Sequence, residues 1–145
     1  MASAENPYVG IDLYLLSDVH ARVESLVVNR SSNELAPFER QIDFWWAGIG
    51  IGVALGQRTP TTAAVTKFNT GIILNSDPWR ITHLELLALS EEGAEAISDP
   101  KRVIRIASEY ANTGTLWLSS KLVGEPGPIL ALTNLMGKFY RQPES

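Results

Sequence analysis

The sequence predicts a mainly α-helical protein: a single compact helical domain with a short N-terminal β-strand and a central, glycine-striped, buried helix. Three observations lead to this prediction. Residues 42–56 are the most apolar stretch of the chain, two Asp-Pro pairs provide helix starts further on, and apolar residues alternate at residues 9–15. Helical patterns therefore account for most of the chain.

A strand followed by a helix is predicted at the N-terminus. In residues 9–15 apolar side chains alternate with smaller or polar ones, which is the period-two pattern of a half-buried strand. Ser17 and Asp18 then supply the side chains of a helix N-cap, and the helix is expected to continue to about residue 28. Residues 29–37 are polar and are predicted to form a loop.

Residues 37–58 are predicted to form one continuous helix at the centre of the fold, because apolar residues surround most of its circumference. Gly48, Gly52 and Gly56 recur at four-residue intervals on one face, where another backbone can approach closely. Two interpretations of this face stay open: packing inside the monomer, or an interface with a second copy or a partner helix. A membrane span is not predicted, because the apolar run is shorter than the roughly 20 residues that a span needs.

The next segment is less regular and leads into two helices. Residues 59–66 are predicted to form a loop, and residues 67–74 a loop or a short extended segment, because Asn-Thr-Gly interrupts their apolar pattern. An Asp-Pro pair opens a helix at residue 77, which is expected to stop at Gly93, and a second pair opens another helix at residue 99.

The C-terminal part is predicted to contain two further helices. Residues 112–114 are similar to a helix C-terminal cap, so residues 115–123 are expected to form a separate helix. Glycine and proline at residues 125–128 indicate a turn, and residues 128–140 carry the pattern of a last helix.

Length and composition fit one domain spanning residues 1–145, with residues 1–7 and 141–145 as flexible ends. The chain is 45% hydrophobic, contains no cysteine and has a formal net charge of −4. The lack of cysteine excludes disulfides and thiolate metal sites. The first residues lack the basic and apolar regions of a secretory signal, so we expect a cytoplasmic protein.

The titratable residues do not form a pattern typical of an active site. His20 and His83 are the two histidines, and neither has a second ligand at metal spacing, whereas a zinc site needs about four ligands. Ser119 and Ser120 lie in an apolar helix without the glycines of a nucleophile elbow. The sequence therefore predicts no catalytic residue, no metal and no cofactor.

The tryptophans favour packing over base stacking. Trp45 and Trp46 are adjacent, so about 100° of helical rotation separates them and one is expected at the edge of the buried face. Trp79 directly follows a helix-starting proline and is expected to pack on the preceding loop. A core position is expected for Trp117.

Nucleic-acid binding has one candidate surface. Lys101, Arg102 and Arg105 are the basic residues of one helix, and Arg58 and Lys67 from loops are expected to join them. An ordinary solvated helix face explains the same pattern. Because acidic residues outnumber basic ones, any direct contact with DNA is expected to be weak.

The N-terminal unit resembles the opening of a ribbon-helix-helix repressor, in which paired strands of a dimer enter the major groove of DNA. The resemblance rests on residues 8–15, followed by Ser-Asp-Val-His-Ala-Arg-Val. The strand departs from that family at Gly10, Asp12 and Tyr14, where repressors carry Lys, Arg or Gln. A dimeric DNA-binding regulator is therefore the alternative function.

A second resemblance covers more of the chain. A Pro-Phe-led helix ending in Gly-Gln-Arg, the apolar segment 81–89, and Ser108-Glu-Tyr-Ala-Asn-Thr-Gly occur in this order. Together they are similar to small accessory proteins of bacterial DNA phosphorothioation (sulfur-modification) and related phage-defence gene clusters. The Glu-Tyr-Ala-Asn run at 109–112 is the most specific element. The resemblance implies no catalytic role for any residue.

We therefore expect a non-enzymatic accessory or adaptor protein that acts through protein-protein contacts in a bacterial DNA-modification or anti-phage defence complex. Such a protein has a protein partner, which includes the case of a homodimer. A small enzyme of unrecognised type is a third hypothesis.

Overall fold

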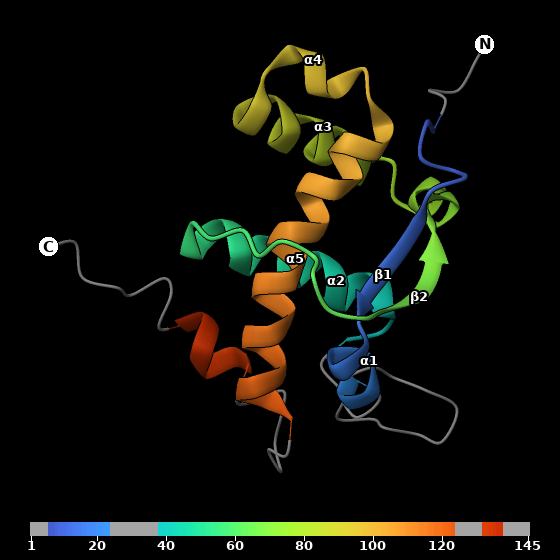
Figure 1. Ribbon diagram of the computed structural model, residues 1–145. Helices are drawn as coiled ribbons and strands as arrows, with labels where there is room; N and C mark the ends of the chain where they lie inside the picture. The colour runs from blue at the N-terminus through green and yellow to red at the C-terminus, as the bar shows by residue number, and fades with distance from the viewer. Residues whose placement is uncertain (1–5, 24–37, 124–131, 138–145) are drawn as a thin grey trace, which may run out of the picture.

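The computed structural model describes residues 6–23, 38–123 and 132–137, and within them the chain is mainly helical with a small antiparallel sheet (Figure 1). The elements, in chain order, are β1 (Asp12–Leu16), α1 (Ser17–Val23), α2 (Gln41–Leu55), β2 (Val65–Thr70), the 3-10 helix η1 (Gly71–Ser76), α3 (Trp79–Glu92), α4 (Ala94–Ile97) and α5 (Pro100–Leu122). A further short helix covers residues 132–137. The predicted fold class is confirmed.

α5 is the long axis of the fold, and α2 crosses it near its middle (Figure 1). The crossing is close because both helices have glycine there. A Cβ atom on Gly114 would collide with the backbone carbonyl of Gly48, and one on Gly52 would collide with the carbonyl of Tyr110. The two backbones are therefore in direct contact, as only residues without a side chain allow.

The prediction of a helix end at residues 112–114 is wrong, because α5 runs unbroken through them. Asn-Thr-Gly is typical of a cap, but here Gly114 removes a side chain at the crossing with α2. Thr113 and Thr115 remain helical, and their hydroxyls donate to the carbonyls of Glu109 and Ala111 one turn earlier. Tertiary packing therefore decides the conformation at this position.

The sheet consists of β1 paired with β2, antiparallel, with a register irregularity between Leu13 and Tyr14. The predicted strand β1 is confirmed. For β2 the prediction of a loop is wrong at residues 65 and 66, whereas residues 67–70 take the extended one of the two alternatives predicted for residues 67–74. The Asn-Thr-Gly interruption lies where β2 ends and η1 begins, and there the Thr70 hydroxyl accepts a hydrogen bond from the backbone N–H of Ile72. The chain thus passes directly from strand to 3-10 helix.

The N-terminal segment is tied to η1 and α3. The Asn6 amide donates to the Gly71 carbonyl at 2.8 Å, and the buried Tyr8 hydroxyl donates to Glu85 at 3.2 Å. Burial, with Glu85 beside it, raises the pKa of Tyr8 well above its ordinary value. Of the ends expected to be flexible, residues 1–5 and 141–145 lie outside the described residues.

Several helix boundaries agree with the sequence. α3 begins and ends next to the Asp-Pro pair and Gly93, and α5 begins at Pro100, with the Asp99 carboxylate accepting from the Arg102 N–H. α4, between these helices, was not predicted. α1 begins at Ser17 as expected, and its predicted continuation from residue 24 and the 29–37 loop lie outside the described residues.

α2 is shorter than the predicted helix, because it covers Gln41–Leu55 of the expected 37–58. Of the last predicted helix, 128–140, only residues 132–137 belong to the described part. Trp45 is fully buried in α2 and Trp46 lies at the edge, as expected for adjacent tryptophans. No helix in the described part of the chain is long and apolar enough to cross a membrane.

Candidate functional site

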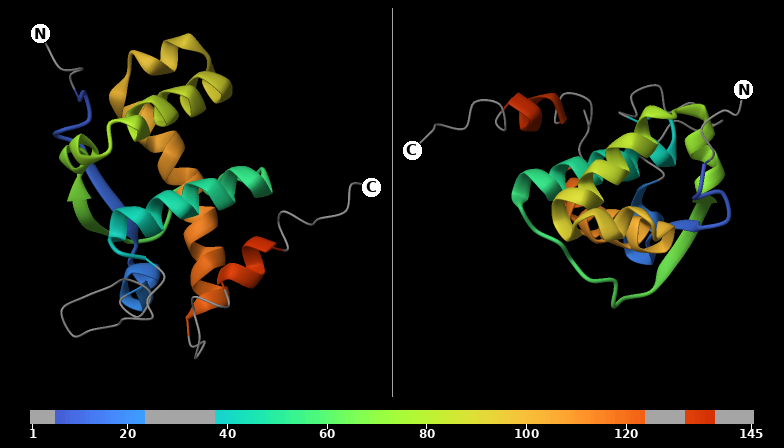
Figure 2. Two further views of the ribbon diagram at one scale, coloured as in Figure 1. Left: turned by 180° about the vertical axis from the view of Figure 1, so that it is seen from behind. Right: turned by 90° about the horizontal axis from the view of Figure 1, so that it is seen from above.

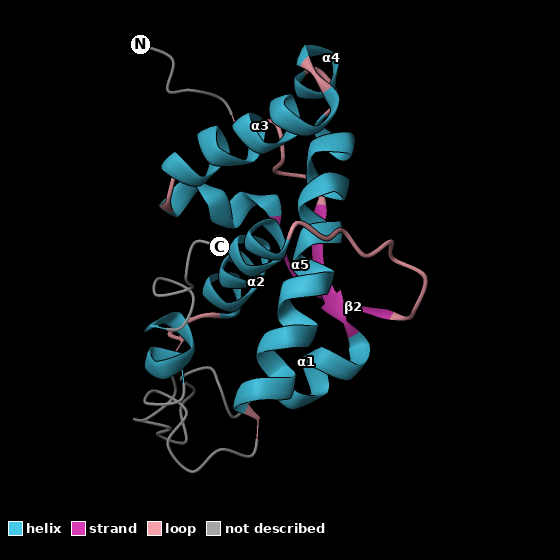
Figure 3. Cartoon of the chain, turned by 90° about the vertical axis from the view of Figure 1, so that its left-hand side faces the viewer, coloured by secondary structure: helices cyan, strands magenta, loops and turns pink. Residues whose placement is uncertain are grey.

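The outer face of α2, opposite the crossing with α5, forms the floor of an apolar groove of about 740 Å³. α2 lies between α3 on one side and the 132–137 helix on the other (Figures 1 and 3). We call this feature the α2 groove. Its lining consists of Phe38; Trp46, Ala47, Ile49, Gly50, Ile51, Val53 and Ala54 of α2; His83, Leu84 and Leu87 of α3; Leu118 of α5; and Leu132 and Met136.

Apolar side chains dominate the α2 groove, and His83 is the titratable residue among the described residues that line it. Part of this surface is open to solvent: Val53 is 45% exposed, and a Cβ atom on Gly50 would meet no heavy atom within 4 Å. An apolar concave surface of this size is the default candidate for a binding site.

One end of the α2 groove is built around Arg80, which lies in the first turn of α3 and is 6% exposed. Its guanidinium donates to Asp43 at 2.8 Å and lies 5.1 and 5.0 Å from the ring centroids of Trp46 and Trp79. Burial alone would raise the pKa of Asp43, but hydrogen bonds from Arg80 and Arg40 outweigh it and lower that pKa below its ordinary value. This pairing holds the beginning of α3 against the beginning of α2.

At the opposite end of the α2 groove, ion pairs join α2 to α3 and α5. Arg58, which follows α2, pairs with Glu91 at 3.2 Å and Glu92 at 3.3 Å from the end of α3, and with Glu109 of α5 at 2.8 Å. A hydrogen bond from Arg102, helped by Arg58, lowers the pKa of Glu92 below its ordinary value. α3, one wall of the α2 groove, is thus fastened at both ends.

The residues predicted to face nucleic acid are placed differently from expectation. Arg58, Arg102 and Arg105 do come together, but they surround the carboxylate of Glu92. Lys67 lies on β2 and pairs with Asp12 of β1 at 3.2 Å. Lys101 is exposed at the start of α5.

Carboxylates thus match the charge of the arginines in this set. The sequence pattern showed the arginines but not their pairing with Glu92, which comes from the end of α3.

The three predicted stripe glycines have two different roles. Gly48 and Gly52 lie at the crossing with α5. Gly56 instead ends α2, with a left-handed φ of 66° and open space where a Cβ atom would be.

Sequence reasoning missed the α2 groove. Ala47, Gly50 and Ala54 follow one another at spacings of three and four residues, on the face opposite Gly48 and Gly52. This second set of small residues was the available signal.

The Glu-Tyr-Ala-Asn run at 109–112, the most specific element of the phage-defence resemblance, binds the loop that follows α2. The backbone carbonyl of Glu109 accepts from the Thr59 N–H at 3.0 Å, and the Asn112 side chain donates to the Thr59 carbonyl at 2.9 Å and to the Thr61 hydroxyl at 2.7 Å. These bonds fasten the segment after α2 to α5. The motif therefore has a structural explanation in this chain.

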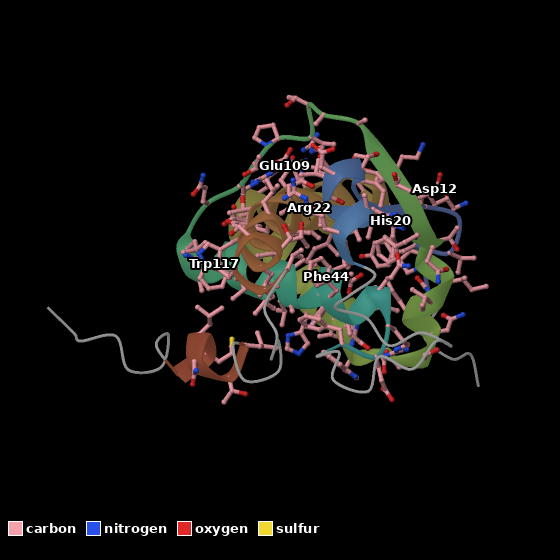
Figure 4. The ribbon with its side chains drawn as sticks, turned by 90° about the horizontal axis from the view of Figure 1, so that it is seen from below. Asp12, His20, Arg22, Phe44, Glu109 and Trp117 are labelled. Carbon is pink, nitrogen blue, oxygen red and sulfur yellow. The ribbon has the colours of Figure 1, made fainter. Side chains whose placement is uncertain are left out.

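The histidines and acidic residues form no metal site in the part of the chain that the structure describes. His20 lies on α1 (Figure 4). His83 packs edge-on against Trp46 and Trp79, with ring centroids 6.3 and 5.7 Å away.

β1 pairs along its length with β2 of the same chain, whereas the strand of a ribbon-helix-helix protein pairs with its copy in the partner. The regulator hypothesis stays a prediction.

No protein-family model, no curated protein and no solved structure matches this chain.

Proposed function

We propose that this protein is a non-enzymatic, cytoplasmic adaptor that binds a partner protein through the α2 groove. The observation that carries the proposal is the groove itself, which is apolar, open at Gly50 and bounded by an α3 wall that is fastened at both ends. Its setting, an accessory role in a bacterial DNA-modification or anti-phage defence complex, rests on the resemblance of residues 37–58, 81–89 and 108–114.

The chemistry of the α2 groove favours a protein segment over a small molecule. Small-molecule sites combine an apolar pocket with several placed polar groups that fix the orientation of the ligand. Among the described residues that line the groove, the side chains that offer a nitrogen are the rings of His83 and Trp46. A protein segment needs no such groups, because burial of apolar side chains supplies about 1.5–3 kcal/mol for each one that is fully covered.

Photo-crosslinking in the host cells tests the proposal. A photoreactive phenylalanine analogue at position 53 lies in the groove, and the same analogue at position 116 provides the matched control. Val53 is 45% exposed and Leu116 is 41% exposed, but Leu116 lies on another surface, beside Pro60 and Ala63. We expect a defined protein product from position 53 alone.

Mass spectrometry would identify the product, and the position of its gene in the host genome would show whether it neighbours DNA-modification genes. No product from position 53, or the same products from both positions, would refute the docking function.

A further inference from the structure

The α2 groove has a direction, because α2 and α3 run parallel along it (Figure 2). Near their N-termini the Arg80 side chain reaches Asp43 at 2.8 Å and Trp46 contacts Trp79 at 5.5 Å between ring centroids. At the other end Arg58, just after α2, reaches Glu91 at 3.2 Å. Two aligned helices therefore place both positive dipole ends at one end of the groove and both negative ends at the other.

The side-chain charges at the two ends of the groove do not cancel the electrostatic field of the helix dipoles. At the N-terminal end Arg40 and Arg80 are balanced by Asp43 and Asp77. At the C-terminal end Arg58, Arg102 and Arg105 are balanced by Glu91, Glu92 and Glu109. Because each cluster is neutral and the lining between them is apolar, the helix dipoles set the polarity of the groove.

The lining also selects the backbone conformation of the occupant. The walls and floor are helices whose backbone groups are hydrogen-bonded within each helix. The N–H and C=O groups of an extended segment would therefore lose their hydrogen bonds to water without gaining new partners in the groove. A helix satisfies these groups internally. The open floor at Gly50 lets such a helix approach α2 closely, as α5 does on the other face at Gly48.

We infer that the α2 groove binds one amphipathic α-helix of a partner protein, which runs antiparallel to α2 and α3 and has a small residue facing Gly50. The antiparallel orientation brings the positive end of the partner helix to the negative ends of α2 and α3. The stripe of this helix that enters the groove is uncharged. This inference rests on the docking function proposed above and adds the conformation, polarity and contact chemistry of the partner segment.

Crosslinking from both ends of the groove tests the polarity. Position 53 lies toward the C-terminal end of α2, and position 83 lies level with Trp46 at the other end. Each carries the photoreactive analogue in a separate variant, and peptide mapping locates both attachment points on the captured protein. We expect the attachment point from position 53 to be N-terminal to that from position 83 by about seven residues, the helical rise between Trp46 and Val53.

Each other outcome has a defined meaning. The reverse order overturns the antiparallel orientation, for which the dipoles predict a preference of at least about threefold, and leaves the docking function standing. A separation of about three residues indicates an extended occupant and overturns the helix. Crosslinking from position 53 that does not exceed the position 116 control overturns the docking function and this inference together.

Substitution of Gly50 tests the close approach. We expect Gly50→Leu to reduce crosslinking from position 83 by at least about tenfold, because the side chain occupies the contact point of the partner helix. Gly50→Ala is expected to change it by less than about threefold, since a methyl group still allows close packing. An unchanged yield with Gly50→Leu would overturn the close approach.

Gly10→Leu is the matched control, because Gly10 is also exposed, has open space around it and lies away from the groove. Thermal unfolding of each variant separates a lost contact from a lost fold.

Discussion

α2 has two faces lined by small residues, and in the described part of the chain only one of them lies in direct contact with the backbone of another helix. On the inner face Gly48 and Gly52 lie against the backbone of α5. On the outer face Gly50, between Ala47 and Ala54, faces open space. The inner face therefore explains how the monomer folds, whereas the outer face has no such explanation in the described part of the chain. A glycine that costs about 1 kcal/mol in a helix interior needs some other reason there.

The largest expected effect is at Gly52. We expect Gly52→Leu to lower the free energy of unfolding by about 3 kcal/mol, because even the Cβ atom collides with the Tyr110 carbonyl. Urea unfolding followed by tryptophan fluorescence measures this change, and Gly50→Leu is the control, expected within about 1 kcal/mol of the wild type. Equal effects at the two positions would show that the inner and outer faces do not differ.

A smaller effect is expected at Arg80, which holds the α3 wall of the groove. We expect Arg80→Met to lower the free energy of unfolding by about 2 kcal/mol, since Asp43 loses its closest partner and remains only 22% exposed. The folded-state pKa of Asp43 is lowered, so its pairing stabilises the protein above the ordinary carboxyl range and this contribution is lost as the pH falls through the folded pKa.

The variant should therefore lose less stability on acidification than the wild type. The same acid dependence in both proteins would contradict a stabilising role for the pair.

Local signals were predictable from sequence, and contacts between distant segments were not. Asp99 caps α5 with its own side chain, so its neighbours alone indicate the helix start. Gly114 looks the same as a helix-ending glycine until Gly48 is placed against it. For the same reason the sequence could not decide between a loop and an extended segment at residues 67–74, because β1, the pairing partner of β2, lies far away in the sequence.

The candidate site follows this rule as well. The stripe at Gly48 and Gly52 indicated close packing, but three segments had to be positioned before the outer face of α2 became a groove. Likewise, Arg102 and Arg105 form a basic pattern in sequence, and only the fold brings Glu92 between them and Arg58.

The smallest effect, and the sharpest comparison of the two faces, is expected from Gly50→Ala. A methyl group at Gly50 meets no heavy atom within 4 Å, so the variant gains helix propensity without a steric cost. We expect the free energy of unfolding to rise by about 0.5 to 1 kcal/mol. Gly52→Ala, two residues away on the same helix, makes the same chemical change but places its methyl group against the Tyr110 carbonyl, so we expect it to be destabilising. Thermal unfolding of both variants under one set of conditions gives the two signs directly. If Gly50→Ala also destabilised the isolated protein, the outer face of α2 would be packed rather than open, and the groove would no longer be available to a partner helix.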